Sequence, residues 1–284
     1  MAKKNRRESQ FVTFARMAHK LAQKEFTPYS HPKSPRKYTQ PQLVACILLM
    51  HRLRLSYRDM EEWLLASDAV VKELGLKDVP TYSALARAAA RMLTLAQIDR
   101  MNASLLTELG IEEEAVAIDA TGFQLTQASD YYINRRGWKI TQYWKGFYGV
   151  GLNTLFILGR SQSYGPGHDG SKLETMRRAV RPFMRSGQWV LLADGGFDVK
   201  SVRPDDLIPP RRTGPKRSIA SPLRQARADL VAVARLDGLF GQRWKVETVI
   251  SVIKRKFGDA IRARKYYLQR REPAIKMLVY NLHH

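Results

Sequence analysis

Residues 115–123 read Ala-Val-Ala-Ile-Asp-Ala-Thr-Gly-Phe, a short apolar run that contains one carboxylate, Asp119. A run of this length and composition is typical of a strand buried inside a sheet. Residues 187–194, Gly-Gln-Trp-Val-Leu-Leu-Ala-Asp, form a second such run, and it also ends in a carboxylate, Asp194. Since open α/β sheets build their sites at the carboxyl ends of strands, the two runs predict both a fold class and the place of its site.

The segments around these two runs complete the predicted α/β domain. Residues 147–162 are long enough for two adjacent strands with a turn near Asn153 or Thr154. The sequence further predicts a helix over 171–186, a last short strand over 206–209, and helices from about residue 222 onward with a break near Gly258. This order is that of a ribonuclease-H-like domain, a mixed sheet flanked by helices, although the order alone fits many α/β folds.

Each aspartate taken by itself is equally explained as a strand-end turn residue or a helix cap. Asp194 is followed by Gly195 and Gly196, which allow a ligand or another stretch of backbone to approach closely. Two carboxylates that end two buried strands of one domain favour a site over two unrelated turns.

A third carboxylate, Glu247, lies in an amphipathic segment. At about 100° per residue, one helical face carries Phe240, Arg243, Glu247, Ser251 and Lys254, and another carries apolar side chains that include Val246 and Val249. The residues alone do not distinguish a functional stripe from a solvated face on which Arg243 and Glu247 form a weak pair one helical turn apart.

The spacing of this segment resembles the Y-x2-R-x3-E-x6-K signature of DDE transposases from prokaryotic insertion sequences, in the group of insertion-sequence families four and five. Its four positions correspond to Phe240, Arg243, Glu247 and Lys254, with phenylalanine where the family usually has tyrosine. The segments Ile118-Asp119-Ala-Thr, Ala193-Asp194-Gly-Gly-Phe and Gly167-His168-Asp169 are also similar to that group, and the resemblance covers about residues 40–284.

The resemblance implies an enzyme that cleaves DNA strands and transfers them by two-metal-ion phosphodiester chemistry. Asp119, Asp194 and Glu247 would be both the catalytic residues and the ligands of two Mg²⁺ ions, for which Mn²⁺ can substitute. Arg243 and Lys254 would hold DNA phosphates, Arg243 as a planar fork and Lys254 as a point charge. Three carboxylates suit this cofactor, because Mg²⁺ prefers oxygen ligands.

The charge of the chain indicates a polyanionic partner. Its 48 Lys and Arg residues exceed its 26 Asp and Glu residues, for a net charge of +22. Eight of these cations lie in residues 254–271, which include Lys254, Arg255 and Lys256 and predict a face that binds the DNA backbone. The sequence contains no run of 18 apolar residues, so it predicts no membrane-spanning helix. The single cysteine, Cys46, excludes a disulfide within the chain, so a cytoplasmic protein associated with the nucleoid is expected.

The sequence predicts three regions. Residues 1–40 carry ten Lys and Arg residues and end in a Pro/Ser-rich piece, which predicts a basic arm and linker. Residues 41–109 predict an all-helical DNA-binding region, with a helix-turn-helix-like unit and a plain helical bundle as equal alternatives. Residues 110–284 predict the ribonuclease-H-like catalytic domain.

Two other functional hypotheses remain open at this stage. A catalytically inactive or domesticated DNA-binding protein of the same fold would have the same composition, and a ribonuclease-H-like nuclease would have the same three carboxylates. The partners expected for a transposase are double-stranded DNA at the element ends and at the target, and a second copy of the chain in a homodimer on DNA, with no membrane.

Overall fold

The computed structural model describes residues 8–125, 143–187, 189–211 and 221–284, and these form two compact units. Unit 1 comprises Met1–Leu105 together with Ala274–His284, and unit 2 comprises Leu106–Pro273. In the described part of the chain, no helix is both long and apolar enough to cross a bilayer.

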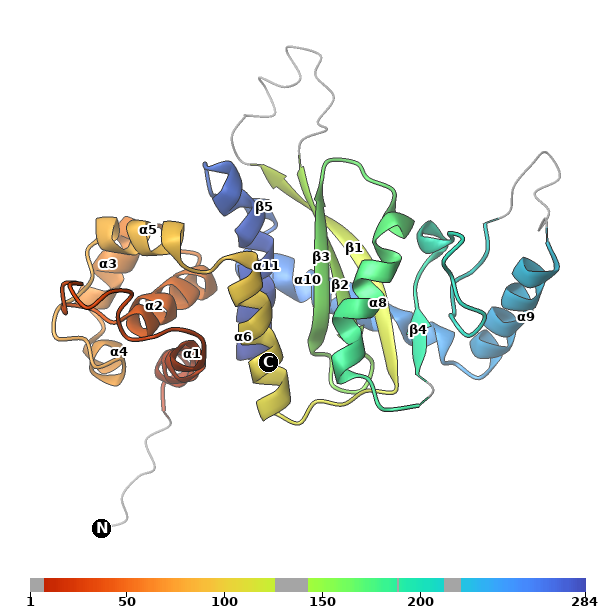
Figure 1. Cartoon of the computed structure of the whole chain (residues 1–284), viewed down its shortest axis with the longest axis horizontal. Coiled ribbons are helices and arrows are strands. Elements are labelled where there is room, and N and C mark those ends of the chain that lie inside the picture. Colours follow the sequence, from red (N-terminus) through yellow and green to blue (C-terminus); the bar gives the residue numbers. More distant parts are fainter. Residues whose placement is uncertain (1–7, 126–142, 188, 212–220) are drawn as a thin grey trace, which may run out of the picture. The chain divides into compact units, whose positions relative to one another are not determined.

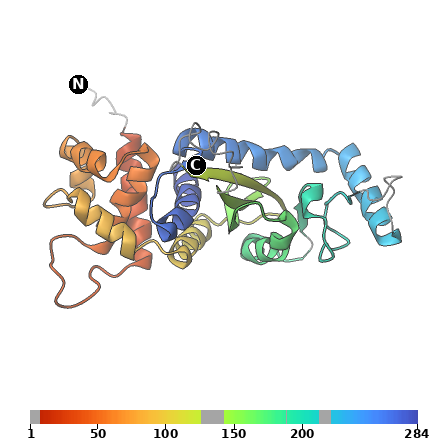
Figure 2. The same cartoon turned by 90° about the horizontal axis from the view of Figure 1, so that it is seen from above.

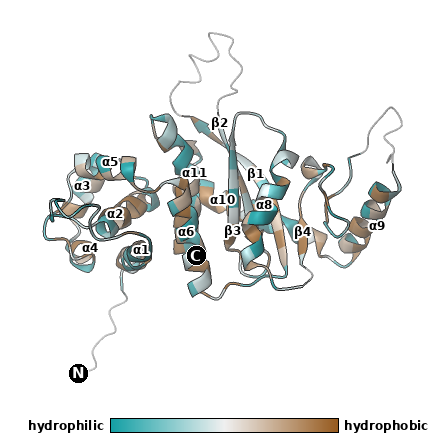
Figure 3. Ribbon diagram, viewed as in Figure 1, coloured by the Kyte–Doolittle hydropathy of each residue, from teal (hydrophilic) through white to brown (hydrophobic). Residues whose placement is uncertain are grey.

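Unit 1 is built from helices in its described part (Figure 1). These are α1 (Gln10–Glu25), α2 (Gln40–Leu53), α3 (Tyr57–Leu65), α4 (Asp68–Glu73), α5 (Tyr82–Arg91), most of α6 (Leu95–Glu108) and the C-terminal end of α11 (Tyr266–His283). The centre of the unit is α2, in which every residue from Leu43 to Met50 is buried, and much of its ribbon has the brown of hydrophobic residues in Figure 3. Side chains cap two of these helices, since Ser56 and Thr81 accept backbone hydrogen bonds at the starts of α3 and α5.

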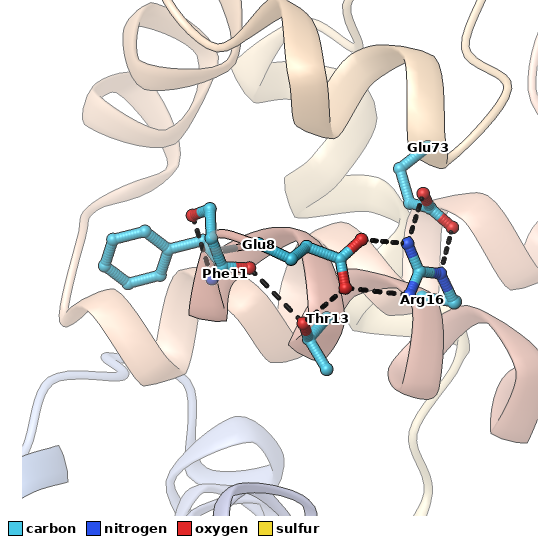
Figure 4. A network of polar contacts seen from close by, with 6 residues as sticks. Glu8, Phe11, Thr13, Arg16 and Glu73 are labelled. Carbon is cyan, nitrogen blue, oxygen red and sulfur yellow. Dashed lines mark hydrogen bonds and ion pairs between the residues drawn. The ribbon is translucent and has the colours of Figure 1, made fainter. Parts of the chain in front are cut away.

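Residues 10–25 depart from the predicted basic arm, because they form helix α1 and pack against α2. The helix buries Phe14, Ala18 and Leu21, which recur at helical spacing. Arg16 on its outer side joins three segments (Figure 4): its Nε donates to Glu73 Oε1 of α4 at 2.7 Å, and its Nη1 donates to Glu8 Oε2 at 3.1 Å. The Pro-rich piece of the predicted linker lies between α1 and α2, so only this part of residues 1–40 lacks a helix among those described.

The sheet of unit 2 is mixed, as the sequence predicts. Its strands are β1 (Ala115–Leu125), β2 (Tyr143–Gly151), β3 (Ile157–Tyr164), β4 (Val190–Leu192) and β5 (Ala260–Ile261). The strand order is β3-β2-β1-β4, with β5 beside the far end of β1. Strands β1, β2 and β3 pair antiparallel, whereas β4 and β5 both run parallel to β1.

Helices cover the two faces of this sheet (Figure 2). Helix α8 (Leu173–Val180) packs on the face of Gly149, where a Cβ atom would lie 2.5 Å from Val180, so only glycine allows this close approach. Helix α10 (Trp244–Phe257) contacts β1 and β2, and its Lys254 lies over the ring of Phe123 on the opposite face. Helix α9 (Pro222–Leu236) precedes α10.

Some predicted elements differ in detail from the observed ones. The helix expected over residues 171–186 is divided into a 3₁₀ turn (Asp169–Lys172), α8 and a second 3₁₀ turn (Arg181–Phe183), because Pro182 cannot continue the α-helical ladder. The strand expected over 206–209 is a single bridge between Leu207 and Leu192. The C-terminal residues 274–284 pack in unit 1, where Asn281 donates to Asn102 of α6 at 2.6 Å and the apolar neighbours of Asn281 are buried.

A buried carboxylate fixes the turn between β2 and β3. Glu113 is fully buried just before β1, and it accepts hydrogen bonds from the backbone of Asn153 at 3.0 Å and from the backbone and hydroxyl of Thr154, each at 2.7 Å. The turn lies where the sequence predicts it, and Glu113 holds it against the start of the strand that carries Asp119.

We expect Glu113→Ala to lower the free energy of unfolding by about 3 kcal/mol, because three donors lose their buried acceptor. The matched control is Glu114→Ala, whose side chain is 58% exposed and pairs with the exposed Arg185; it should cost less than about 0.5 kcal/mol. Urea unfolding of both variants measures the difference, and equal losses would contradict the anchoring role of Glu113.

Candidate active site

The pairing of β1 with β4 brings two aspartates to one edge of the sheet. The last paired residues of these parallel strands are Ala117 and Leu192, and Asp119 and Asp194 each follow two residues later. Each aspartate uses one carboxylate oxygen in a local backbone hydrogen bond of 2.8 Å, Asp119 from the N–H of Ala120 and Asp194 from the N–H of Gly196. The parallel register therefore aligns the two carboxylates that the sequence singles out.

Glu247 lies in the first turn of α10, on the side of the helix away from its packed face. Val246, Val249 and Ile253 are buried, as the helical pattern predicts, and they fix the rotation of α10. The helical face predicted from Phe240 to Lys254 is only partly α-helical, because its first residues, Phe240–Arg243, form a 3₁₀ turn, η4. Three residues per turn change the direction of Phe240 relative to the α-helical expectation.

Arg243 and Glu247 form the ion pair that the sequence left open. Arg243 Nη2 donates to Glu247 Oε1 at 2.6 Å, with side-chain exposures of 25% and 51%. An ion pair this exposed contributes little to stability, so it does not explain by itself why both residues are present.

The electrostatics of Asp119 connect all four residues. The pKa of Asp119 is raised to about 6, chiefly by burial. The Ala120 N–H and the Arg243 guanidinium oppose the rise, and the nearby negative charges of Asp194 and Glu247 add to it. The three predicted carboxylates and Arg243 therefore occupy one electrostatic neighbourhood, in which negative charge exceeds positive charge.

The carboxylate oxygens of these residues are the kind of ligand that a hard divalent cation prefers. A cation would also relieve the repulsion that raises the pKa of Asp119. Within the described ranges, however, no three His, Cys, Asp or Glu side chains gather closely enough to form a metal site. The residues thus suit a divalent ion in type and charge, and their side chains would have to draw together to bind it.

The predicted DNA-binding cations lie at the other end of α10. The Lys254 ammonium lies 5.8 Å from the centre of the Phe123 ring, on the strand that carries Asp119. Arg255 and Lys256 are exposed in the last turn of the helix. Arg243 and Glu247 therefore lie at the N-terminal end of α10, and the other three cations lie at its C-terminal end.

Two contacts of the Asp194 loop were not found from the sequence. Arg211 Nε donates to the carbonyl oxygen of Gly195 at 2.7 Å, although 16 residues separate them. On the other side of the loop, an added Cβ at Gly196 would lie 2.7 Å from Asp194 Oδ1 and 3.5 Å from Asp169 Oδ2. In the sequence, only the basic character of the segment near residue 211 and the adjacent His168-Asp169 pair pointed to these neighbours of the Asp194 loop.

Asp169 is itself held by an ion pair with Lys145 of β2. Lys145 also donates to the carbonyl oxygen of Gly167 at 3.3 Å. The sequence groups Lys145 with Trp138, Tyr143 and Trp144 as a basic and aromatic cluster; Trp138 lies outside the described residues, and Trp144 is buried against Tyr164 and Tyr266. Lys145 thus orders the loop beside Asp194.

Comparison with protein families identifies one match. The family model described as "Transposase DDE domain" matches residues 111–282, which is more than half of the 284-residue chain and includes Asp119, Asp194 and Glu247. No curated protein matches the chain.

The raised pKa of Asp119 predicts a pH-dependent stability. A carboxyl whose pKa is about 6 in the folded protein, against an ordinary value of 3.8, stabilises the fold at pH below 3.8, and this contribution is lost as the pH rises through 6. In EDTA, we therefore expect Asp119→Asn to gain on the order of 2 kcal/mol over the wild type between pH 4 and pH 8. Denaturant unfolding at both pH values measures this gain.

The control variant is Asp229→Asn, which removes an exposed carboxylate from α9. It tests whether loss of any negative charge produces the same pH dependence. A stability difference between Asp119→Asn and the wild type that stays constant with pH would rule out the predicted titration.

Proposed function

Since the chain belongs to the Transposase DDE domain family, we propose that it binds the ends of an insertion sequence and catalyses DNA strand cleavage and strand transfer. The observation that carries this proposal is the shared neighbourhood of Asp119, Asp194 and Glu247 inside the matched region. We assign these three side chains as the catalytic residues and as the ligands of two Mg²⁺ ions, with Mn²⁺ as a substitute.

The proposed reaction is an in-line displacement at a phosphodiester. Bound divalent ions would supply activation of the attacking oxygen and stabilisation of the leaving oxygen. The chain contributes the scaffold: the β1–β4 register holds Asp119 and Asp194, while the packed face of α10 directs Glu247. The short backbone hydrogen bonds of the two aspartates orient one oxygen of each carboxylate and leave the other for a ligand.

Arg243 has a second role in this proposal. In the observed structure its guanidinium neutralises Glu247. If Glu247 were to hold a cation, the Arg243 guanidinium would be available for a DNA phosphate, which it could bind with two parallel hydrogen bonds. Lys254, Arg255 and Lys256 would contact phosphates further along the same strand.

The finer assignments rest on the same features. The order β3-β2-β1-β4, with β1 to β3 antiparallel and β4 parallel, supports a ribonuclease-H-like fold for unit 2. In unit 1, α5 exposes Tyr82, Arg87 and Arg91, which supports recognition of double-stranded DNA at the element ends. Because two element ends must be joined in one reaction, we propose that the chain forms a homodimer on DNA. We also propose that the protein is associated with the prokaryotic nucleoid, where its DNA substrate lies.

One observation favours a second candidate function. The Arg243–Glu247 ion pair already satisfies one oxygen of the third carboxylate, as it would in a DNA-binding relative that no longer cleaves. Both functions predict binding to DNA, and only the first predicts cleavage that depends on all three carboxylates.

We expect Glu247→Gln to reduce strand cleavage by at least about a hundredfold and to leave DNA binding intact, because the side chain keeps its size but loses the charge that a metal ligand requires. Asp119→Asn and Asp194→Asn should behave in the same way. The assay pairs cleavage with gel shift on duplexes taken from the DNA that flanks the coding sequence, in Mg²⁺ or Mn²⁺. Glu112→Gln, at an exposed glutamate, is the matched control, and full cleavage by Glu247→Gln would refute the assignment.

Salt dependence tests the cationic end of α10. Each lost phosphate contact should lower the slope of log affinity against log salt by about 0.9. Lys254→Gln, Arg255→Gln and Lys256→Gln should therefore each flatten the slope for duplex DNA, measured by fluorescence anisotropy. Lys24→Gln, at an exposed position of α1, is the control, and three variants with the wild-type slope would remove this helix end from the interface.

A further inference from the structure

A cavity of about 700 Å³ lies beside the segment that follows the Asp194 loop. One wall is formed by residues 198–204 and the other by the first half of α9. Apolar side chains, among them Val199 and Leu230, line part of both walls. Both walls also carry cations: Lys200 lies in the first wall, and Arg224 and Arg227 lie in the second.

Asp198 orients the two arginines. Its buried carboxylate accepts from Arg227 Nη2 at 2.7 Å, from Arg224 Nη2, and from the backbone N–H of Arg211 at 2.8 Å. Burial opposes ionisation of Asp198, yet these donors hold its pKa below the ordinary value. Both guanidiniums are therefore fixed through the same end, their Nη2 atoms.

The other ends of these guanidiniums lack acceptors among the residues that the structure describes. Arg227 Nη1 and Arg224 Nε are buried and make no hydrogen bond there, and Arg227 as a whole is only 8% exposed. An unmet buried donor on a charged group costs more free energy than most unmet hydrogen bonds, so each of these two arginines keeps unused hydrogen-bonding capacity. Asp198 supplies one negative charge against two guanidiniums, and Lys200 adds a further positive charge at the rim.

We propose that this cavity binds a phosphate group, with Arg227 and Arg224 as its ligands and Lys200 at its entrance. The proposal deepens the proposed function, because a phosphodiester of bound DNA is one source of that group, and free phosphate is the other. Arg224 and Arg227 both line the cavity, and a guanidinium can bind a phosphate through parallel hydrogen bonds. The apolar walls strengthen the attraction by lowering the local dielectric constant.

The position of the cavity relates it to the candidate active site. Arg211 contacts both Asp198 and Gly195, so the arginine cluster and the Asp194 loop share one residue. A phosphate bound to Arg227 would therefore lie close to Asp198, which follows Asp194 by four residues and accepts a hydrogen bond from Arg227. The cavity is thus placed to hold a second phosphate of a strand that reaches the carboxylates.

The first test is a calorimetric titration of the full chain with inorganic phosphate in a phosphate-free buffer of low ionic strength. We expect saturable binding, weakened about tenfold or more by Arg227→Lys, which keeps the charge beside Asp198 but loses the forked donor. Lys200→Gln, at an exposed residue that pairs with nothing among the described residues, should also weaken it. Arg178→Gln, at an exposed arginine of α8 outside the cavity, should not.

Thermal unfolding of each variant shows whether the fold is kept, and Lys200→Gln preserves the test if Arg227→Lys does not fold. No saturable binding by the wild type, or wild-type affinity in both cavity variants, would overturn the proposal and leave the arginines as a structural pair for Asp198.

The second arm identifies the source of the phosphate. If it is DNA, Lys200→Gln should flatten the salt slope of duplex binding by about 0.9, whereas Arg227→Lys should lower the affinity with little change of slope and Arg178→Gln should change neither. Phosphate binding with unchanged slopes would assign the site to free phosphate and exclude the DNA backbone. Because the titration does not depend on cleavage, phosphate binding that persists in Glu247→Gln, or in a chain that cleaves no DNA, separates this inference from the proposed function.

Discussion

The parallel pairing of β1 with β4 is the constraint on which the candidate site depends. Only three residue pairs, Ala115–Val190 to Ala117–Leu192, define this register, and both aspartates lie two residues beyond its end. Because side chains alternate between the faces of a strand, a slip of one residue would turn one carboxylate away from the other. The remainder of the sheet protects this register: β2 and β3 brace β1 from its other side, and Glu113 fastens their turn to the start of β1.

Beyond the strands, the site is held by contacts to its loops. Asp194 caps the short 3₁₀ turn Gly195–Phe197, and the Arg211 side chain donates to the carbonyl oxygen of Gly195 in that turn. No side chain larger than hydrogen fits at residue 196 without displacing a carboxylate. Small residues and long-range polar contacts therefore position Asp194 more closely than the strand alone does.

The sequence predicted the features that follow from local periodicity. The strand runs that contain Asp119 and precede Asp194, and the packed face of α10 around Val249, all depend on neighbours within a few residues. The prediction that Asp119 ends its strand was wrong, because β1 continues to Leu125 through its pairing with β2. The sequence failed where charge concealed a weaker apolar pattern, as in α1, whose Phe14 and Leu21 lie among many cations. It also failed where the partner is distant in the chain, as for Arg211 and Gly195, since no local pattern records such a contact. The 3₁₀ turn of Phe240–Arg243 escaped because α-helical and 3₁₀ spacing differ little over four residues.

The distribution of charge explains how a chain of net charge +22 maintains an acidic site. Asp119 lies near the carboxylates of Asp194 and Glu247 and near the guanidinium of Arg243, and burial, with a smaller contribution from the two other carboxylates, raises its pKa. Four residues beyond Asp194 the balance is reversed, because Asp198 faces two arginines whose outer donors are unmet. Residues 194–198 thus run from an acidic region, at Asp194, to a basic region, at the arginines that contact Asp198. A DNA strand bound along this loop would place its phosphates near the arginines, while a cation would neutralise the carboxylates.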